Sequence, residues 1–421
     1  MPSSCPELAS ATADLAARSR PWRLPPRAAF PLLAAVLFAF FFAAAAPSPL
    51  FVVFQHAWHF SSSLLTVAFA VYAIALLVSL LIAGSLSDHI GRRPVVLAAL
   101  VLQAVAMGLF LLANGIGGLI AARVVQGIAT GVASGALSAA VVEAAPATRK
   151  RLGAMITSVS PLAGLAVGAL LTGIAVKFSV QPVMLVFGVL ALVFALGAAV
   201  VLWMPETVTP RAGALASLVP RVSIPVRARA EFARGLPVFV VVWALGGLYL
   251  SLAPSLMLHV FGIDNGVVNG LTVAVLSGMG AIAPTLLARF AAPKPIILGM
   301  ASIAVGLVLL LASLATRSLA LFFVGTAVAG LGFGGAFSAL VQTLAPLAQS
   351  HERGELFAAI FVVSYLAFSL PAMLAGFLVA PVGLLTTTEG YAAVLLLIAA
   401  FGVWNQWAVL RRGARELPVS E

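Results

Sequence analysis

Long apolar segments, separated by short charged ones, extend over almost the whole chain. Charged residues leave uninterrupted runs at 28–87, 94–122, 124–142, 152–176, 178–205, 235–263, 265–288, 295–316, 318–351, 356–388 and 390–410. A helix that crosses a lipid bilayer needs about 20 mainly apolar residues. The first run is long enough for two such helices, and the run 124–142 continues a helix that begins near Ile116. The pattern therefore predicts twelve transmembrane helices.

We expect the approximate limits of these helices at 28–54, 63–86, 94–113, 116–142, 152–175, 181–203, 236–260, 268–288, 295–315, 318–346, 355–379 and 390–410. A cleaved signal peptide that ends in the alanines at 43–46 is an alternative for the first helix. The apolar stretch continues to Phe54, which favours an intact transmembrane helix.

The predicted helices form two sets of six that are nearly equal in length. The chain divides accordingly into a tail, a first set, a polar linker, a second set and a second tail: 1–27, 28–203, 204–235, 236–410 and 411–421. Ala46-Pro47-Ser48 near the end of the first helix resembles Ala253-Pro254-Ser255 in the seventh. Internal repeats mark many transporters, which move one repeat against the other around a central site. We expect an all-α membrane protein built as two pseudo-symmetric six-helix bundles.

Composition agrees with a membrane protein and gives the helices an orientation. Apolar residues make up 62% of the chain and charged residues 8%, against about 45–50% and 25% in soluble proteins. A net charge of +11 would suggest nucleic acid as the partner of a soluble chain. Here the 23 Lys and Arg residues fall on one side of the twelve helices, except Lys177, Arg317 and Arg123. Because cytoplasmic loops are rich in Lys and Arg, we expect cytoplasmic N- and C-termini and contact with the lipid bilayer, not with nucleic acid.

The loop between the second and third predicted helices carries a dense motif. It reads Gly84-Ser85-Leu86-Ser87-Asp88-His89-Ile90-Gly91-Arg92-Arg93-Pro94. This closely resembles the G-x-L-x-D-(R/K)-x-G-(R/K)-(R/K) signature of the major facilitator superfamily (MFS), with His89 where Arg or Lys is usual. The resemblance implies the MFS fold and alternating access. It also implies a conformational latch between the two halves, formed by Gly84, Asp88, Gly91, Arg92 and Arg93.

Three further motifs resemble the same superfamily. Arg123-Val124-Val125-Gln126-Gly127 is similar to its R-x-x-Q-G motif, and Met204-Pro205-Glu206-Thr207 to the P-E-T after the sixth helix. The segment 164–173 is a degraded form of the antiporter motif G-x-x-x-G-P-x-x-G-G, and its Gly164, Gly168 and Gly173 suit close helix packing. Overall the chain resembles the twelve-helix drug-efflux branch.

Arg123 is the one charged residue deep within a predicted helix. It lies roughly 10 Å from the outer end of the fourth helix at 1.5 Å per residue. A cation at this depth must face protein or water. The resemblance implies a role in coupling or substrate binding for Arg123, with Gln126 and Gly127 beside it. The alternative is that Arg123 extends outward to the membrane surface or braces backbone carbonyls of the first helix.

A central cavity lined by the first, fourth, seventh and tenth helices, as the resemblance implies, would be mostly aromatic and apolar. Its candidate residues are Phe41, Trp243, Tyr249, Phe333 and Phe337. No Asp or Glu occupies the middle of these four helices, so the proton-carrying residue stays unassigned.

Several other classes of function lack the residues that they need. The single cysteine, Cys5, forms neither an internal disulfide nor a zinc cluster, and the chain has no phosphate-binding G-x-x-x-x-G-K-(S/T) loop. The G-x-G-x-x-G at 330–335 lies within an apolar helix, which argues against dinucleotide binding. We expect no metal, no cofactor and no enzymatic activity.

These observations predict a monomeric secondary transporter of the inner (plasma) membrane. We expect it to export small amphipathic organic compounds, drugs or metabolites, in exchange for protons. Uptake or facilitated diffusion of a small solute such as an organic acid or sugar is the alternative. A membrane sensor that binds a ligand without moving it is a further one, because fold does not determine function.

Overall fold

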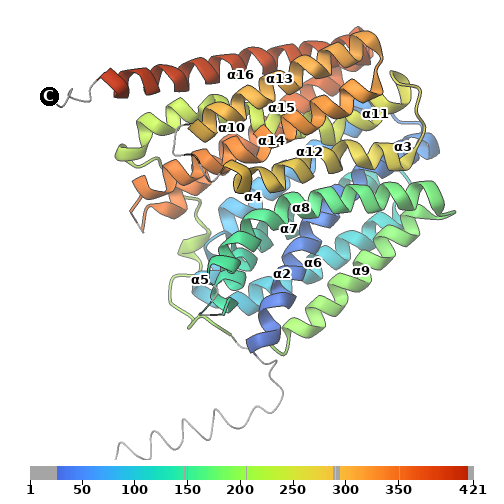
Figure 1. The fold of residues 1–421 in the computed structure, drawn as a ribbon. Helices are drawn as coiled ribbons and strands as arrows, with labels where there is room; N and C mark the ends of the chain where they lie inside the picture. Colours follow the sequence, from blue (N-terminus) through green and yellow to red (C-terminus); the bar gives the residue numbers. More distant parts are fainter. Residues whose placement is uncertain are drawn as a thin grey trace, which may run out of the picture.

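The structure is a computed structural model in which most of the described residues are helical (Figure 1). It describes residues 26–415, apart from positions 147, 149, 205, 288, 289, 291–293 and 350. The expected N-terminal tail up to residue 25, with Cys5, and the end of the C-terminal tail from residue 416 lie outside the described residues. No strand occurs within the described ranges, in agreement with the predicted fold class.

Twelve segments of the described chain are long and apolar enough to cross a membrane, as the sequence predicts. In chain order they are α2 with α3 (Pro26–Ala45, Pro47–Trp58), α4 (Ser62–Ala83), α6 (Arg92–Leu112), α7 (Ile116–Ala144), α8 (Lys150–Phe178), α9 (Pro182–Val201), α10 with α11 (Arg229–Ser251, Ala253–His259), α12 (Gly266–Leu287), α13 (Lys294–Thr316), α14 (Leu319–Leu344), α15 (Arg353–Val382) and α16 (Leu384–Arg415). Short helical turns are α5 (Leu86–Ile90), η2 (Ala216–Leu218), η3 (Val226–Ala228) and η4 (Ala345–Leu347).

The buried apolar side chains gather into two large cores. One core consists of residues from α2 to α9, joined by Leu250, Val273 and Ala372. The other consists of residues from η3 to α16. In Figure 1 the blue-to-green helices accordingly pack together below the yellow-to-red ones. We call these helix sets the first and second halves.

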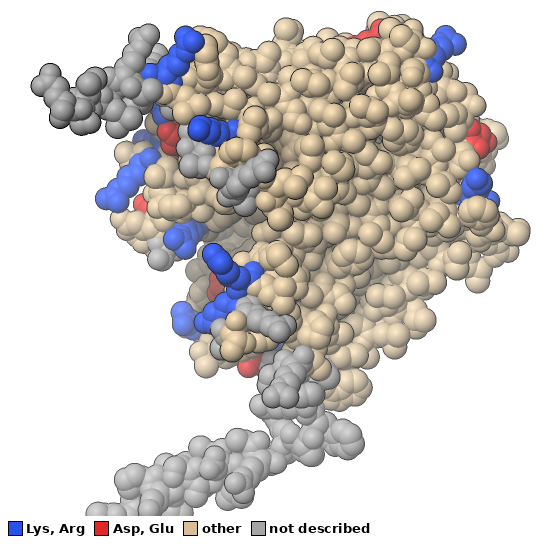
Figure 2. All heavy atoms as spheres, viewed as in Figure 1, with Lys and Arg blue, Asp and Glu red and all other residues tan. Residues whose placement is uncertain are grey.

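Charge defines the two ends of the molecule. The starts of α6, α8, α13 and α15 and the segment after α9 carry the basic residues Arg92, Lys150, Lys294, Arg353 and Arg211. Figure 2 shows most Lys and Arg side chains on the side where these segments lie, and the surface there is recessed between the two halves. We call this the basic end, and the end that carries α3 and α11 the opposite end.

Glycines let helices touch within each half in a repeated way. A Cβ at Gly127 or Gly131 of α7 would overlap backbone carbonyls of α4, and one at Gly330 or Gly334 of α14 would overlap carbonyls of α12. The fourth helix thus packs on the second as the tenth packs on the eighth. Because the hydrophobic effect does not drive helices together within lipid, close backbone packing stabilises such pairs.

The two halves meet along two helix pairs, α4 with α15 and α8 with α12. Near the opposite end, the hydroxyl of Ser63 on α4 donates to the carbonyl of Gly376 on α15 at 2.9 Å. Gly173 of α8 lies directly against Gly266 and Gly270 of α12, where a Cβ would overlap the Gly266 carbonyl. Gly173 therefore belongs to the contact between the halves.

Gly164 and Gly168 face a different neighbour from Gly173. A Cβ at Gly164 would come within 2.8 Å of the Phe38 carbonyl and the Phe41 Cβ on α2, and one at Gly168 would overlap Phe42. The three glycines of the predicted packing stripe thus serve two contacts, one inside the first half and one between the halves.

Replacing Gly127 by leucine is expected to destabilise the protein by about 3 kcal/mol, because the added atoms overlap the backbone of α4. The matched control is Gly108→Leu on α6, where a Cβ would meet nothing within 4 Å. Thermal unfolding of both variants in detergent checks this. Equal unfolding temperatures for the two variants would contradict the proposed packing role.

Candidate functional site

The turn that carries the loop motif is built around Gly91. Gly91 has a φ of 104°, which suits glycine, and it separates α5 from α6. The carboxylate of Glu206 accepts hydrogen bonds from the backbone N–H of Arg92 at 2.8 Å and of Arg93 at 3.0 Å. A Cβ at Gly91 would overlap that carboxylate. Glu206, the acid of the P-E-T segment, therefore caps the N-terminus of α6, where a negative charge is favourable.

The Arg92 guanidinium joins three parts of the first half at the basic end. It pairs with Asp88 at 2.5 Å and with Glu143 at the end of α7 at 3.1 Å. Glu143 also accepts a hydrogen bond from the Thr207 hydroxyl at 2.8 Å. Arg93 donates to the backbone carbonyl of Leu202. We call Asp88, Arg92, Glu143, Glu206 and Thr207 the loop network.

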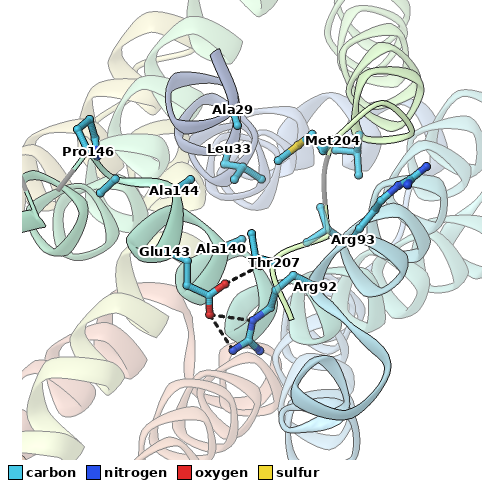
Figure 3. Close-up of a pocket in the computed structure, with 13 residues that line it drawn as sticks. Ala29, Leu33, Arg92, Arg93, Ala140, Glu143, Ala144, Pro146, Met204 and Thr207 are labelled. Carbon is cyan, nitrogen blue, oxygen red and sulfur yellow. Dashed lines mark hydrogen bonds and ion pairs between the residues drawn. The ribbon is translucent and has the colours of Figure 1, made fainter. Parts of the chain in front are cut away.

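A cavity of about 420 Å³ opens behind the loop network. Figure 3 shows Arg92, Glu143 and Thr207 along one wall, with the hydrogen bonds between them. Arg93 also lines the cavity. The remaining wall is apolar and comes from α2, α6, α7 with the two residues after it, and the end of α9: Ala29, Leu33, Val96, Ala140, Ala144, Ala145, Pro146, Val201 and Met204. The cavity and its wall belong to the first half and the segment that follows it.

Polar contacts to backbone carbonyls hold the segment after α9 against the loop motif. The Arg211 N–H donates to the His89 carbonyl at 2.8 Å, and the Ser85 hydroxyl donates to the Ser217 carbonyl at 3.1 Å. His89 Nδ1 lies 3.2 Å from the Ala212 carbonyl. Each of these partners is in the first half or the linker. The contact of Asp88 with the second half that a latch requires stays a prediction.

The first membrane segment breaks at Ala46, between α2 and α3. Pro47 has no N–H, so the carbonyl of Ala43 lacks its helical donor. The Gln126 side chain on α7 donates to that carbonyl at 2.7 Å. Arg123 donates to Gln126 Oε1 at 2.8 Å and, over longer distances of 3.4 and 3.3 Å, to the carbonyls of Ala44 and Ala68. Both side chains therefore brace the break in the first membrane segment.

Arg123 is a buried cation whose described partners are neutral. Its side chain is 1% exposed, and its guanidinium stacks on the Tyr72 ring at 4.2 Å. Stacking on an aromatic face favours a cation, but it leaves the positive charge in place. In this conformation the guanidinium donates to the carbonyls of Ala44 and Ala68 and to Gln126, the kind of contact that the bracing alternative describes.

Aromatic rings from both halves meet near the α4–α15 contact. Trp243 of α10 lies 4.9 Å from Tyr365, 5.9 Å from Phe368 and 5.7 Å from Phe337, measured between ring centroids. Phe368 also lies 4.8 Å from Phe69 of the first half. We call Phe69, Trp243, Phe337, Tyr365 and Phe368 the aromatic cluster. The Trp243 indole nitrogen is buried and has no hydrogen-bond partner among the described residues.

The other expected cavity residues, Phe41, Phe333 and Tyr249, pack against different neighbours. Phe41 packs on α8 beside Gly164, and Phe333 lies against Gly246 and Gly280. Tyr249 is 1% exposed, and its hydroxyl is 2.9 Å from that of Thr326. Tyr249 therefore lies in the core of the second half, where its ring is 5.8 Å from that of Phe322.

Sequence reasoning left out Tyr365, Phe368 and Phe69, which complete the cluster around Trp243. Their helices, α15 and α4, are not among the four that the resemblance assigns to the cavity. It also left Glu206 without a role, although the P-E-T match at 205–207 was a usable signal.

Comparison with known proteins agrees with this geometry. A model of the Major Facilitator Superfamily matches residues 33–372. The chain belongs to the major facilitator superfamily, a family of membrane transporters. No protein with a curated description matches the sequence significantly.

Two solved structures share the fold. The crystal structure of the human organic anion transporter MFSD10 (TETRAN) has a TM-score of 0.64 and 17% sequence identity, over 90% of this chain and 100% of that chain. A POT family transporter in complex with 5-aminolevulinic acid has a TM-score of 0.69 and 14% identity, over 90% of this chain and 96% of that chain. At such low identity the similarity concerns the fold alone.

Replacing Gln126 by leucine is expected to destabilise the protein by about 1–3 kcal/mol, because the Ala43 carbonyl then loses its donor in a buried position. Gln103→Leu is the matched control. The amide group of Gln103 is buried on α6 without a partner among the described residues, so its removal is expected to raise the unfolding temperature or leave it unchanged. Thermal unfolding in detergent separates the two outcomes, and the reverse order would contradict the bracing role of Gln126.

Proposed function

We propose that this chain is a secondary transporter that exports small amphipathic organic compounds by alternating access, with protons as the exchanged ion. The observation that carries the proposal is the aromatic cluster, which lies between the halves and holds a buried indole N–H without a partner. Aromatic walls with few polar groups are typical of sites for small organic ligands. A site between two halves is accessible from alternate sides when the halves rock.

The distribution of charge supports an orientation. With the basic end in the cytoplasm, both termini are cytoplasmic and the linker lies on the same side, as positively charged loops require. In this orientation the contacts between Ser63 and Gly376 and between Gly173 and Gly266 close the outer end. The recessed surface at the basic end then faces the cytoplasm, from which an exporter takes its substrate (Figure 2).

A second candidate is facilitated diffusion without a coupled ion. It is favoured by the absence of any Asp or Glu from the middle of the predicted transmembrane helices, since a carboxylate is the usual proton carrier at membrane depth. Purified protein in proteoliposomes distinguishes the candidates. Transport of an amphipathic dye that follows an imposed pH gradient and stops with an uncoupler supports antiport, whereas indifference to both supports facilitated diffusion.

Trp243→Ala is expected to lower dye transport about tenfold or more, because the variant removes the ring that contacts three other members of the cluster. Trp404→Ala is the matched control, since Trp404 on α16 is 60% exposed on the outer surface. The measurement is initial transport rate per molecule of reconstituted protein. Equal rates for both variants would exclude the cluster from the substrate path.

Asp88→Asn tests the proposed latch. It is expected to slow transport about tenfold while changing the unfolding free energy by less than about 1 kcal/mol, because exposed ion pairs contribute little stability and the Asp88 side chain is 57% exposed. Glu231→Gln removes an ion pair outside the loop network, between Glu231 and Arg234 on α10, and is expected to leave transport unchanged. A slow Glu231→Gln variant, or a fast Asp88→Asn variant, would argue against a specific latch.

A further inference from the structure

The charge balance in the membrane-embedded centre of the protein is positive. Of the 12 acidic residues in the sequence, those within the helices lie near helix ends, as Glu143, Glu231, Glu355 and Glu389 do. Arg123 is the one basic residue at depth, and it is 1% exposed. Its hydrogen-bond acceptors are two backbone carbonyls and an amide oxygen, which are neutral. Among the described residues, no acidic side chain therefore pairs with Arg123.

Arg123 and the aromatic cluster are connected through Tyr72. The guanidinium stacks on the Tyr72 ring at 4.2 Å. Tyr72 in turn belongs to one buried cluster with Tyr365, against which Trp243 and Phe368 pack. Tyr72 thus lies between the Arg123 guanidinium and the aromatic cluster. The protein interior there has a low dielectric constant, so it screens the positive charge weakly.

The cluster also offers a hydrogen-bond donor in need of an acceptor. Trp243 Nε1–H is buried and has no partner among the described residues. An indole nitrogen donates and does not accept, and a buried donor without a partner is destabilising. A ligand that brings an acceptor oxygen restores this bond, and the bond is stronger when the oxygen is negatively charged.

From these two observations we propose that the central site selects organic anions, with an aromatic or aliphatic body among the rings and an anionic oxygen at Trp243 Nε1–H. The proposal rests on the transport function proposed above and names its substrate class. Arg123 acts on the anion through its electric field, since its Nε and Nη1 groups already donate to Ala68, Ala44 and Gln126. An organic cation at the same place meets the positive charge of Arg123, and the described part of the chain places no acid beside it to pair with.

If the substrate is an anion, the membrane potential drives its export. A cell interior that is negative by 100 mV expels a monovalent anion to an equilibrium ratio of about fiftyfold. An exporter of anions in this membrane needs no proton carrier. This driving force acts on the anion with or without a coupled proton, so the proposed substrate class does not depend on which of the two transport routes operates.

The test uses the full-length protein in proteoliposomes with a potassium diffusion potential and equal pH on both sides. The probes share a naphthalene ring and differ in charge: a naphthalene sulfonate, the neutral sulfonamide and a naphthyl trimethylammonium. The sulfonate is permanently charged, so it does not cross the bilayer as a neutral acid. We expect sulfonate flux toward the positive side at least tenfold faster than flux of the ammonium probe, above that of protein-free vesicles.

Two outcomes overturn the proposal in distinguishable ways. Ammonium flux equal to or faster than sulfonate flux refutes anion selection and leaves the transport function standing. Flux of none of the three probes counts against the transport function and the anion selection together.

Variants test the two residues separately. Trp243→Phe keeps an aromatic ring but removes the N–H, so we expect about a tenfold loss of sulfonate flux and sulfonamide flux within twofold of wild type. Trp404→Phe is the matched control and is expected to change neither flux.

Arg123→Gln is expected to remove the preference for anion over cation, whereas Arg123→Lys is expected to keep it. An unchanged anion-to-cation ratio in folded Arg123→Gln protein, or equal losses for both neutral and anionic probes in Trp243→Phe, would contradict the mechanism.

Discussion

The structure depends on how two broken membrane helices satisfy their backbone carbonyls. Pro47 and Pro254 each lack the N–H that would complete the helix, which leaves the carbonyls of Ala43 and Leu250 without a helical donor. Lipid offers no replacement. Gln126 on α7 donates to the Ala43 carbonyl, and Ser48 donates to the Leu250 carbonyl at 2.9 Å. The first bond stays inside one half, but the second crosses from the first half to the second.

The two Ala-Pro-Ser segments therefore do more than echo each other in sequence. Each proline leaves one backbone carbonyl without its helical donor at a corresponding place in its half. Ser48 of the first segment donates to the Leu250 carbonyl, which Pro254 of the second segment leaves without a donor. The bond joins the first turn of α3 to the last turn of α10. A contact of one hydroxyl with one carbonyl is weak enough to break during a cycle, whereas the bonds of Arg123 and Gln126 are several and buried.

Sequence reasoning predicted the helices well because hydrophobic length is a strong signal in membrane proteins. It predicted Arg123 as exceptional for the same reason. It did not separate Gly173 from Gly164 and Gly168, because spacing shows which residues share a helix face but not which neighbour lies against them. The cavity role of Tyr249 was predicted from its helix alone and stays a prediction; the structure adds that its hydroxyl lies 2.9 Å from that of Thr326. Glu206 caps a helix more than a hundred residues before it in the sequence, which no local pattern reveals.

Arg123 cannot both brace the broken helix and bind a ligand directly with the same donors. If Arg123 turned toward a substrate, the carbonyls of Ala44 and Ala68 would lose a donor, and Gln126 would lose the partner that orients it. Leaving buried polar groups unpaired is costly. The break, α7 and α4 are therefore expected to move as one rigid unit, with Arg123 fixed inside it. Its charge then reaches the aromatic cluster in every state in which Tyr72 stays next to Tyr365, and the contacts that change are those between the halves.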